Sequence, residues 1–123
     1  HCSSSLTQRF AQKLLSDTKF VDSFMNESNL RLKKTKDKII NSLPHIEFIH
    51  GESGLFFLVN LKKMLKEHTF IEEQKLTDQL LKDHKVFLTA GQHMGLNIPG
   101  YFRLCFAKKS PLVGELIERL KKM

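Results

Sequence analysis

The chain has 123 residues, of which 20 are basic and 13 acidic, giving a formal charge of +7. Hydrophobic residues make up 41% and include ten Phe, so the chain can bury a core and is not disordered. It has only two cysteines, Cys2 and Cys105, and no apolar run of about 18 residues, which excludes a disulfide scaffold and a membrane span. We expect one compact domain, or part of a larger one, in a reducing cytoplasmic compartment.

The first five residues, H-C-S-S-S, contain neither an initiator Met nor the pattern of a secretory signal. We therefore expect the sequence to begin at a fragment boundary.

Two helices are predicted in the first third of the chain. Apolar residues at four-residue spacing indicate the first helix: Leu6, Phe10 and Leu14. Residues 16–18, S-D-T, prefer caps and interrupt it. A longer helix is predicted over residues 20–42, and Pro44 ends it.

The apolar period then changes to that of strands. Residues 46–49 predict a short strand and residues 51–54 a turn. The run L-F-F-L-V at residues 55–59 predicts a second strand that is buried on both faces. Thr69 and Glu72 match a capping box, and the apolar residues after them continue a helix.

The last third predicts two further strands and a helix. Residues 86–89 form the third strand, a Gly-rich loop covers residues 90–100, and residues 101–107 form the fourth strand. Ser110 is the expected N-cap of the closing helix, with Pro111 at its first position. The order α-α-β-β-α-β-β-α predicts an α+β fold, with a small antiparallel or mixed sheet of about four strands packed by helices.

Arg103 is the candidate functional residue. The alternation of the fourth strand places it on one face with Tyr101 and Cys105, opposite Phe102 and Leu104. Such an Arg forms a salt bridge with an acid of the chain, lies on a solvated face, or binds a carboxylate or phosphate through its two parallel N–H groups. The spacing alone favours the first two interpretations.

Other motifs do not indicate a site. The six histidines have no metal-ligand spacing, and five of them are spread over the later elements: His45, His50, His68, His84 and His93. The S-x-x-K match at residues 16–19 lacks the companion motifs of acyl-transfer serine enzymes, and no phosphate-binding loop is present. The lysines are scattered over several elements, which favours a solvated basic surface over a nucleic-acid interface. A free-standing basic module that binds nucleic acid or a protein partner remains the alternative function.

Several segments resemble one enzyme family in order and spacing. Residues 99–107, P-G-Y-F-R-L-C-F-A, resemble the P-G-W-F-R-V-C-F-A strand of 1-aminocyclopropane-1-carboxylate synthases. Residues 15–21, L-S-D-T-K-F-V, resemble L-S-D-E-K-F-V, and residues 54–61, G-L-F-F-L-V-N-L, resemble G-L-F-C-W-V-D-L. Residues 3–8 resemble S-S-x-T-Q and residues 27–31 resemble E-S-x-x-R. These synthases are pyridoxal-phosphate enzymes of fold type I, close to the class I and II aminotransferases.

The resemblance implies the C-terminal small domain at residues 44–123, preceded by a helical lead-in at residues 1–43 that connects to a large domain. It implies an amino-acid substrate, a homodimer, and binding of the substrate α-carboxylate by Arg103. The Schiff-base Lys and the other cofactor-binding residues lie upstream in the family, so this segment has no catalytic or metal residue and is expected to be inactive alone. Tyr101 and the residues around Gln92 depart from the family pattern near the substrate, so lyase and transaminase chemistry both stay open, with the lyase slightly favoured.

Overall fold

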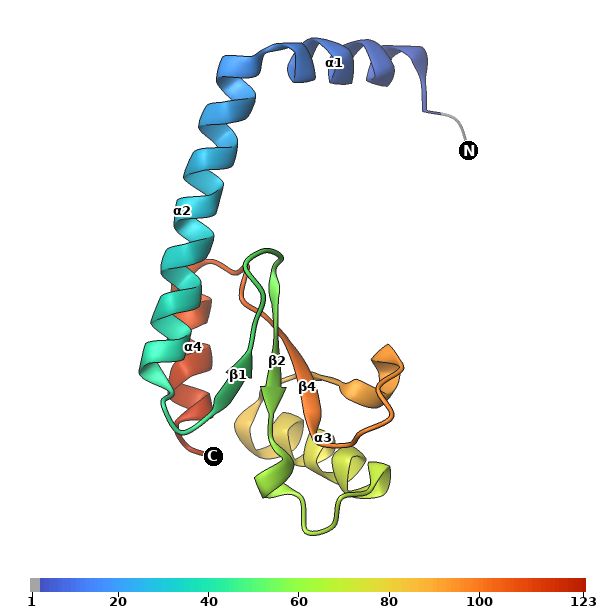
Figure 1. The fold of residues 1–123 in the computed structure, drawn as a ribbon, viewed down its shortest axis with the longest axis vertical. Helices are drawn as coiled ribbons and strands as arrows, with labels where there is room; N and C mark the ends of the chain where they lie inside the picture. Colours follow the sequence, from blue (N-terminus) through green and yellow to red (C-terminus); the bar gives the residue numbers. More distant parts are fainter. Residues whose placement is uncertain (1–2) are drawn as a thin grey trace. The chain divides into compact units, whose positions relative to one another are not determined.

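The computed structural model describes residues 3–123, and Cys2 therefore lies outside the part described (Figure 1). Two compact units are distinguished, residues 1–33 and residues 34–123. The unit boundary falls within the long helix α2 (Thr18–Ser42). No helix among the described residues has the length and apolar character needed to cross a membrane.

The first unit contains α1 (Ser5–Ser16) and the part of α2 that ends at Lys33. Ser4 caps α1 by accepting a hydrogen bond from the Thr7 amide at 3.3 Å. Asp17 separates the two helices, because its amide donates to Leu14 at the end of α1 while its carboxylate accepts from the Phe20 amide at 3.0 Å. The predicted interruption at residues 16–18 is confirmed, and an Asp side chain is its physical cause.

Large apolar side chains of the first unit are exposed rather than packed. They lie on both helices: Leu6, Phe10, Leu15, Phe20, Phe24, Met25 and Leu30. Phe20 and Phe24 contact each other on one face of α2, with ring centroids 6.0 Å apart. So much exposed apolar side chain is typical of a surface that another protein segment covers.

The second unit is built on a four-stranded antiparallel sheet (Figure 1). Its order is β1 (Glu47–Ile49), β2 (Phe56–Asn60), β4 (Tyr101–Cys105) and β3 (Thr89–Ala90). Helices α3 (Phe70–His84) and α4 (Ser110–Leu120) complete the unit, with the short 3₁₀ turns η1 (Lys62–Met64) and η2 (Gly91–Met94). The predicted α+β class and element order are confirmed.

One face of the sheet forms the core. Phe57 and Phe102 are 1% and 0% exposed, and the Phe57 ring packs on Phe106 at 4.7 Å between centroids. The helices supply further buried side chains: Ile39, Leu76, Leu80, Val113, Ile117 and Leu120. Burying each Phe contributes roughly 1.5–3 kcal/mol, so these rings anchor the two central strands against the helices.

Two strand predictions are wrong in part. The second strand is not buried on both faces, because Phe57 and Val59 are buried while Phe56 remains 46% exposed. The third strand does not begin at Val86, since the Val86 amide donates to the Leu80 carbonyl at 3.0 Å and so closes the end of α3. Only Thr89 and Ala90 pair with β4.

The start of α4 also differs from the prediction. Lys109, and not Ser110, occupies the N-cap, and its side chain makes no capping hydrogen bond. Ser110 is the first helical residue, and Pro111 follows in the first turn, where its missing N–H has no cost.

Gly100, directly before β4, is a glycine whose lack of a side chain the fold requires. Its φ is +93°, a left-handed value that residues with a Cβ rarely adopt. A Cβ on it would lie 2.9 Å from the Lys62 Cα and 2.6 Å from the Lys62 Cγ. The contact with backbone leaves no space that a rotamer change could create.

Replacing Gly100 by Ala is therefore expected to destabilise the chain by about 3 kcal/mol or more. Gly54 is the matched control, because it has a similar φ of +95° and a Cβ added to it would meet no atom within 4 Å. Gly54→Ala should carry only the backbone strain, about 1–2 kcal/mol. Urea unfolding of both variants measures the difference, and equal losses would show that the approach of Lys62 does not matter.

Candidate functional site

Arg103 lies in the middle of β4, where strands on both sides hold its backbone. It is paired with Leu58 on β2 and with Thr89 on β3. Its side chain is exposed, Tyr101 and Cys105 beside it are half-buried, and Phe102 and Leu104 are buried. The predicted division of this strand into two faces is confirmed, and it directs the guanidinium away from the core.

The Arg103 guanidinium lies over an aromatic ring. Its central carbon is 4.7 Å from the centroid of Phe56, a cation–π contact worth roughly 0.5–1 kcal/mol at an exposed site. No ion pair formed within residues 3–123 includes Arg103. The salt-bridge interpretation therefore has no partner there, and the contact with Phe56 uses none of the guanidinium N–H groups in a hydrogen bond to an acid, so they are available for an anion.

A shallow groove of about 350 Å³ adjoins this guanidinium. Arg103 and Lys108 supply its cationic groups, and Thr89 and Cys105 add small polar side chains. The rest of the lining is apolar and includes Phe56, Phe87, Leu88 and Leu112. Such a surface suits an organic anion, whose charged end pairs with Arg103 while its carbon atoms contact the apolar wall.

The start of β4 is held by a residue that the sequence analysis did not single out. Glu73 of α3 is 1% exposed, and its Oε2 accepts a hydrogen bond of 2.6 Å from the Gly100 amide. Its Oε1 accepts one of 3.3 Å from the Gln92 amide. The available signal was its position, because Glu73 shares the spacing of the buried Leu76 and Leu80 and so places an acid in an apolar stripe.

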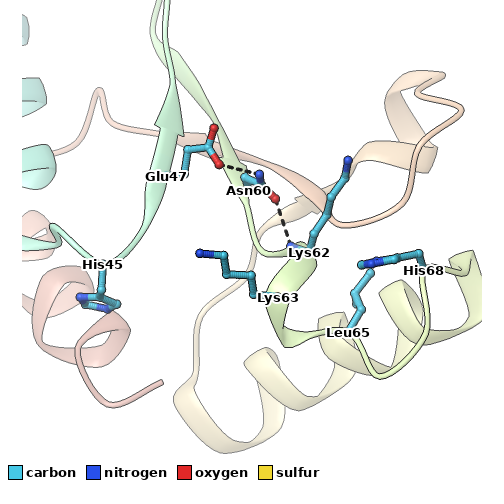
Figure 2. Close-up of a pocket in the computed structure, with 7 residues that line it drawn as sticks. All are labelled: His45, Glu47, Asn60, Lys62, Lys63, Leu65 and His68. Carbon is cyan, nitrogen blue, oxygen red and sulfur yellow. Dashed lines mark hydrogen bonds between the residues drawn. The ribbon is translucent and has the colours of Figure 1, made fainter.

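A second groove, of about 500 Å³, lies between β1 and η1 (Figure 2). Its lining is His45, Glu47, Asn60, Lys62, Lys63, Leu65 and His68. Asn60 donates to Glu47 at 2.7 Å and accepts from the Lys62 amide at 3.1 Å. Figure 2 shows the ammonium groups of Lys62 and Lys63 pointing in different directions, so they do not converge on one ligand.

Histidines and acids do not form a metal centre in the part of the chain that is described. No group of three His, Cys, Asp or Glu side chains within residues 3–123 comes close enough to hold an ion. His45, Glu47 and His68 all line the second groove, but within residues 3–123 they do not form a group that could hold an ion. Cys105 is a free thiol.

Comparison with known proteins identifies the family. The model of the aminotransferase class I and II family matches residues 1–120. This chain belongs to that family. It is 38% identical over 106 residues to 1-aminocyclopropane-1-carboxylate synthase 2 of Solanum lycopersicum, covering 85% of the chain and 22% of the synthase. The match leaves the alternative of a free-standing basic module without support.

Solved structures agree on the fold. Aspartate aminotransferase of Thermotoga maritima superposes with a TM-score of 0.72 at 22% identity, over 98% of this chain and 28% of that one. The PLP-bound C–S lyase of Staphylococcus hominis superposes with a TM-score of 0.66 at 18% identity, over 80% of this chain and 24% of that one. The chain thus spans about a quarter of the length of the relatives it matches.

Enzymes of this class I and II family use pyridoxal phosphate, but the described residues do not fit a Schiff base with it. Every lysine within residues 3–123 is exposed or half-exposed. A hydrogen bond to Glu72 raises the pKa of Lys75, which keeps that amine protonated and non-nucleophilic. The second groove offers cations but only Leu65 as an apolar wall, so it does not fit the pyridine ring either.

The chain mixed with pyridoxal phosphate is therefore expected to form no stoichiometric adduct that absorbs visible light, because no lysine within residues 3–123 is buried away from water. Absorbance titration measures this directly, with free lysine as the control for random reaction. A one-to-one adduct that a single Lys→Ala substitution abolishes would contradict it.

Proposed function

We propose that residues 1–123 form the substrate-carboxylate-binding part of a pyridoxal-phosphate enzyme that acts on an amino acid. The enzyme would be a lyase similar to 1-aminocyclopropane-1-carboxylate synthase or a related aminotransferase. Residues 44–123 would be its small domain and residues 1–43 the helical lead-in from a large domain. On this proposal the segment alone is inactive.

The observation that carries the proposal is the state of Arg103. Its guanidinium is exposed, has no ion-pair partner within residues 3–123, and lies in a strand whose two neighbours hold its backbone. A carboxylate can accept two parallel hydrogen bonds from a guanidinium, which fixes its orientation as well as its position. Arg103 is therefore positioned and accessible to bind a carboxylate of the substrate.

The chemistry divides between the cofactor and this segment. Pyridoxal phosphate, when bound elsewhere in the enzyme, supplies the electron sink for reaction at the substrate α-carbon. Arg103 would bind the α-carboxylate, and Phe56 would keep the guanidinium plane in place beneath it. Holding the carboxylate at a rigid strand orients the α-carbon toward the reactive centre, and that orientation lowers the entropic part of the barrier.

Two features support a larger assembly. The exposed apolar side chains of the first unit, such as Phe10 and Phe24, have the character of a covered surface. The chain also spans only about a quarter of its relatives. We propose that the enzyme's own large domain covers these helices, and that the complete enzyme is a homodimer.

Arg103→Lys in the complete enzyme is expected to retain the fold and the cofactor absorbance, since the cofactor is held elsewhere. An ammonium cannot reproduce the two parallel hydrogen bonds, and a poorly paired substrate carboxylate costs about 2–5 kcal/mol. The kcat/KM for amino acids should fall by roughly two to three powers of ten. Steady-state kinetics with an amino acid and with an amine that lacks the carboxylate measure the effect.

The amine should react almost as well with the variant as with the wild type. Arg119→Lys is the matched control, because Arg119 lies on α4 and pairs with Glu115 rather than facing the groove. It should change neither substrate's kinetics. If Arg103→Lys unfolds the enzyme, or slows the amine and the amino acid alike, Arg103 does not bind the carboxylate.

A further inference from the structure

The loop between β3 and β4 is fastened at both ends to one buried carboxylate. From its position we infer that Glu73 is a positioning residue for Arg103, an inference that rests on the proposed function. Glu73 would act by holding this loop, and so the start of β4, in the one arrangement that presents the guanidinium to the substrate carboxylate.

The contacts of Glu73 connect three parts of the second unit. Its two oxygens accept from the amides of Gln92, near the start of the loop, and Gly100, at its end. Gly100 is also held from the other side, because its carbonyl accepts a hydrogen bond of 2.8 Å from the Leu61 amide just after β2. Helix α3, the loop and the end of β2 are therefore joined at one residue, Gly100.

Among residues 3–123, Glu73 has no cationic partner that would explain its burial. No ion pair within residues 3–123 includes it, and its described partners are two backbone amides. Burying a carboxylate is costly unless hydrogen bonds replace its water, and an apolar residue would extend the stripe of Leu76 and Leu80 without that cost. An acid at this position is consistent with a role in geometry rather than in core stability.

The hydrogen-bonding chemistry of the Glu73 side chain suggests a variant that tests this role. A carboxylate accepts on both oxygens, whereas a Gln amide has one oxygen and one NH₂ group, which donates. In Glu73→Gln one backbone amide of the loop would therefore face a donor, and that end of the loop would be released. Side-chain size hardly changes, so the variant alters hydrogen bonding and little else.

If the loop is released, its movement would displace Arg103 through β4. Arg103 follows Gly100 by only three residues, and a strand rises about 3.3 Å per residue, so a shift at Gly100 is carried along β4 with little room for relaxation. A misplacement of about 1 Å in a group that orients the substrate can cost up to 100-fold in rate. The decrease in kcat/KM should be confined to substrates that bind through a carboxylate.

The test is a double-mutant cycle in the complete enzyme, with Glu73→Gln, Arg103→Lys and the double variant. For each, kcat/KM is measured with an amino acid and with an amine that lacks the carboxylate. Glu73→Gln should lower the value for the amino acid about tenfold, chiefly through KM, and leave the amine within twofold. In the Arg103→Lys background the same substitution should have less than a threefold effect, since the group it positions is gone.

Glu72→Gln is the matched control, because Glu72 is the adjacent residue of α3 and pairs with the exposed Lys75 rather than with the loop. This variant should change kcat/KM for neither substrate. Hydrogen exchange of residues 91–103 supplies an independent readout and should accelerate in Glu73→Gln but not in Glu72→Gln. If Glu73→Gln fails to fold, Glu73→Asp, which keeps the charge but is too short to reach both amides, is measured in its place.

The outcomes separate this inference from the proposed function. Equal losses for amine and amino acid, or full additivity with Arg103→Lys, would overturn the positioning role while leaving Arg103 as the carboxylate-binding group. If Arg103→Lys itself does not distinguish the two substrates, the proposed function fails and the inference fails with it. The inference is supported if Glu73→Gln lowers kcat/KM for the amino acid alone, and if this loss is absent in the Arg103→Lys background.

Discussion

The backbone of Gly100 is the point on which the candidate site depends. Its amide donates to the buried Glu73 at 2.6 Å and its carbonyl accepts from Leu61 at 2.8 Å, so this one residue joins α3, the end of β2 and the start of β4. The left-handed φ and the approach of Lys62 exclude any side chain there. Because β4 begins at the next residue, these constraints set where Arg103 lies before any ligand binds.

Alternation along β4 puts buried side chains on one face of the strand and the candidate binding residue on the other. Phe102 and Leu104 are buried, while Arg103 between them faces outward over Phe56. The core side of the strand resists displacement because each buried side chain contributes roughly 1.5–3 kcal/mol. The outer side can therefore carry a guanidinium without an ion-pair partner at no cost to the core. This division is what allows a strand, rather than a flexible loop, to present the candidate binding group.

The elements that could be predicted are those with local causes. Pro44, the Thr69 cap and the alternation around Arg103 are readable from neighbouring residues, and the structure confirms the helices, the strand and the face that they predicted. Glu73 could not be assigned in this way, because its partner Gly100 is 27 residues away. The early start predicted for β3 failed for a related reason, since Val86 bonds to the end of α3 instead of a strand. An apolar run such as residues 55–59 also cannot reveal which of its faces the rest of the fold covers.

The most direct test of the account is a crystal structure of the complete enzyme with a non-reactive amino-acid analogue that keeps the α-carboxylate. We predict both carboxylate oxygens at about 2.7–2.9 Å from the guanidinium nitrogens of Arg103, with the Glu73 and Gly100 contact intact. A carboxylate bound by other residues, with Arg103 paired to an acid of the protein, would contradict the central claim.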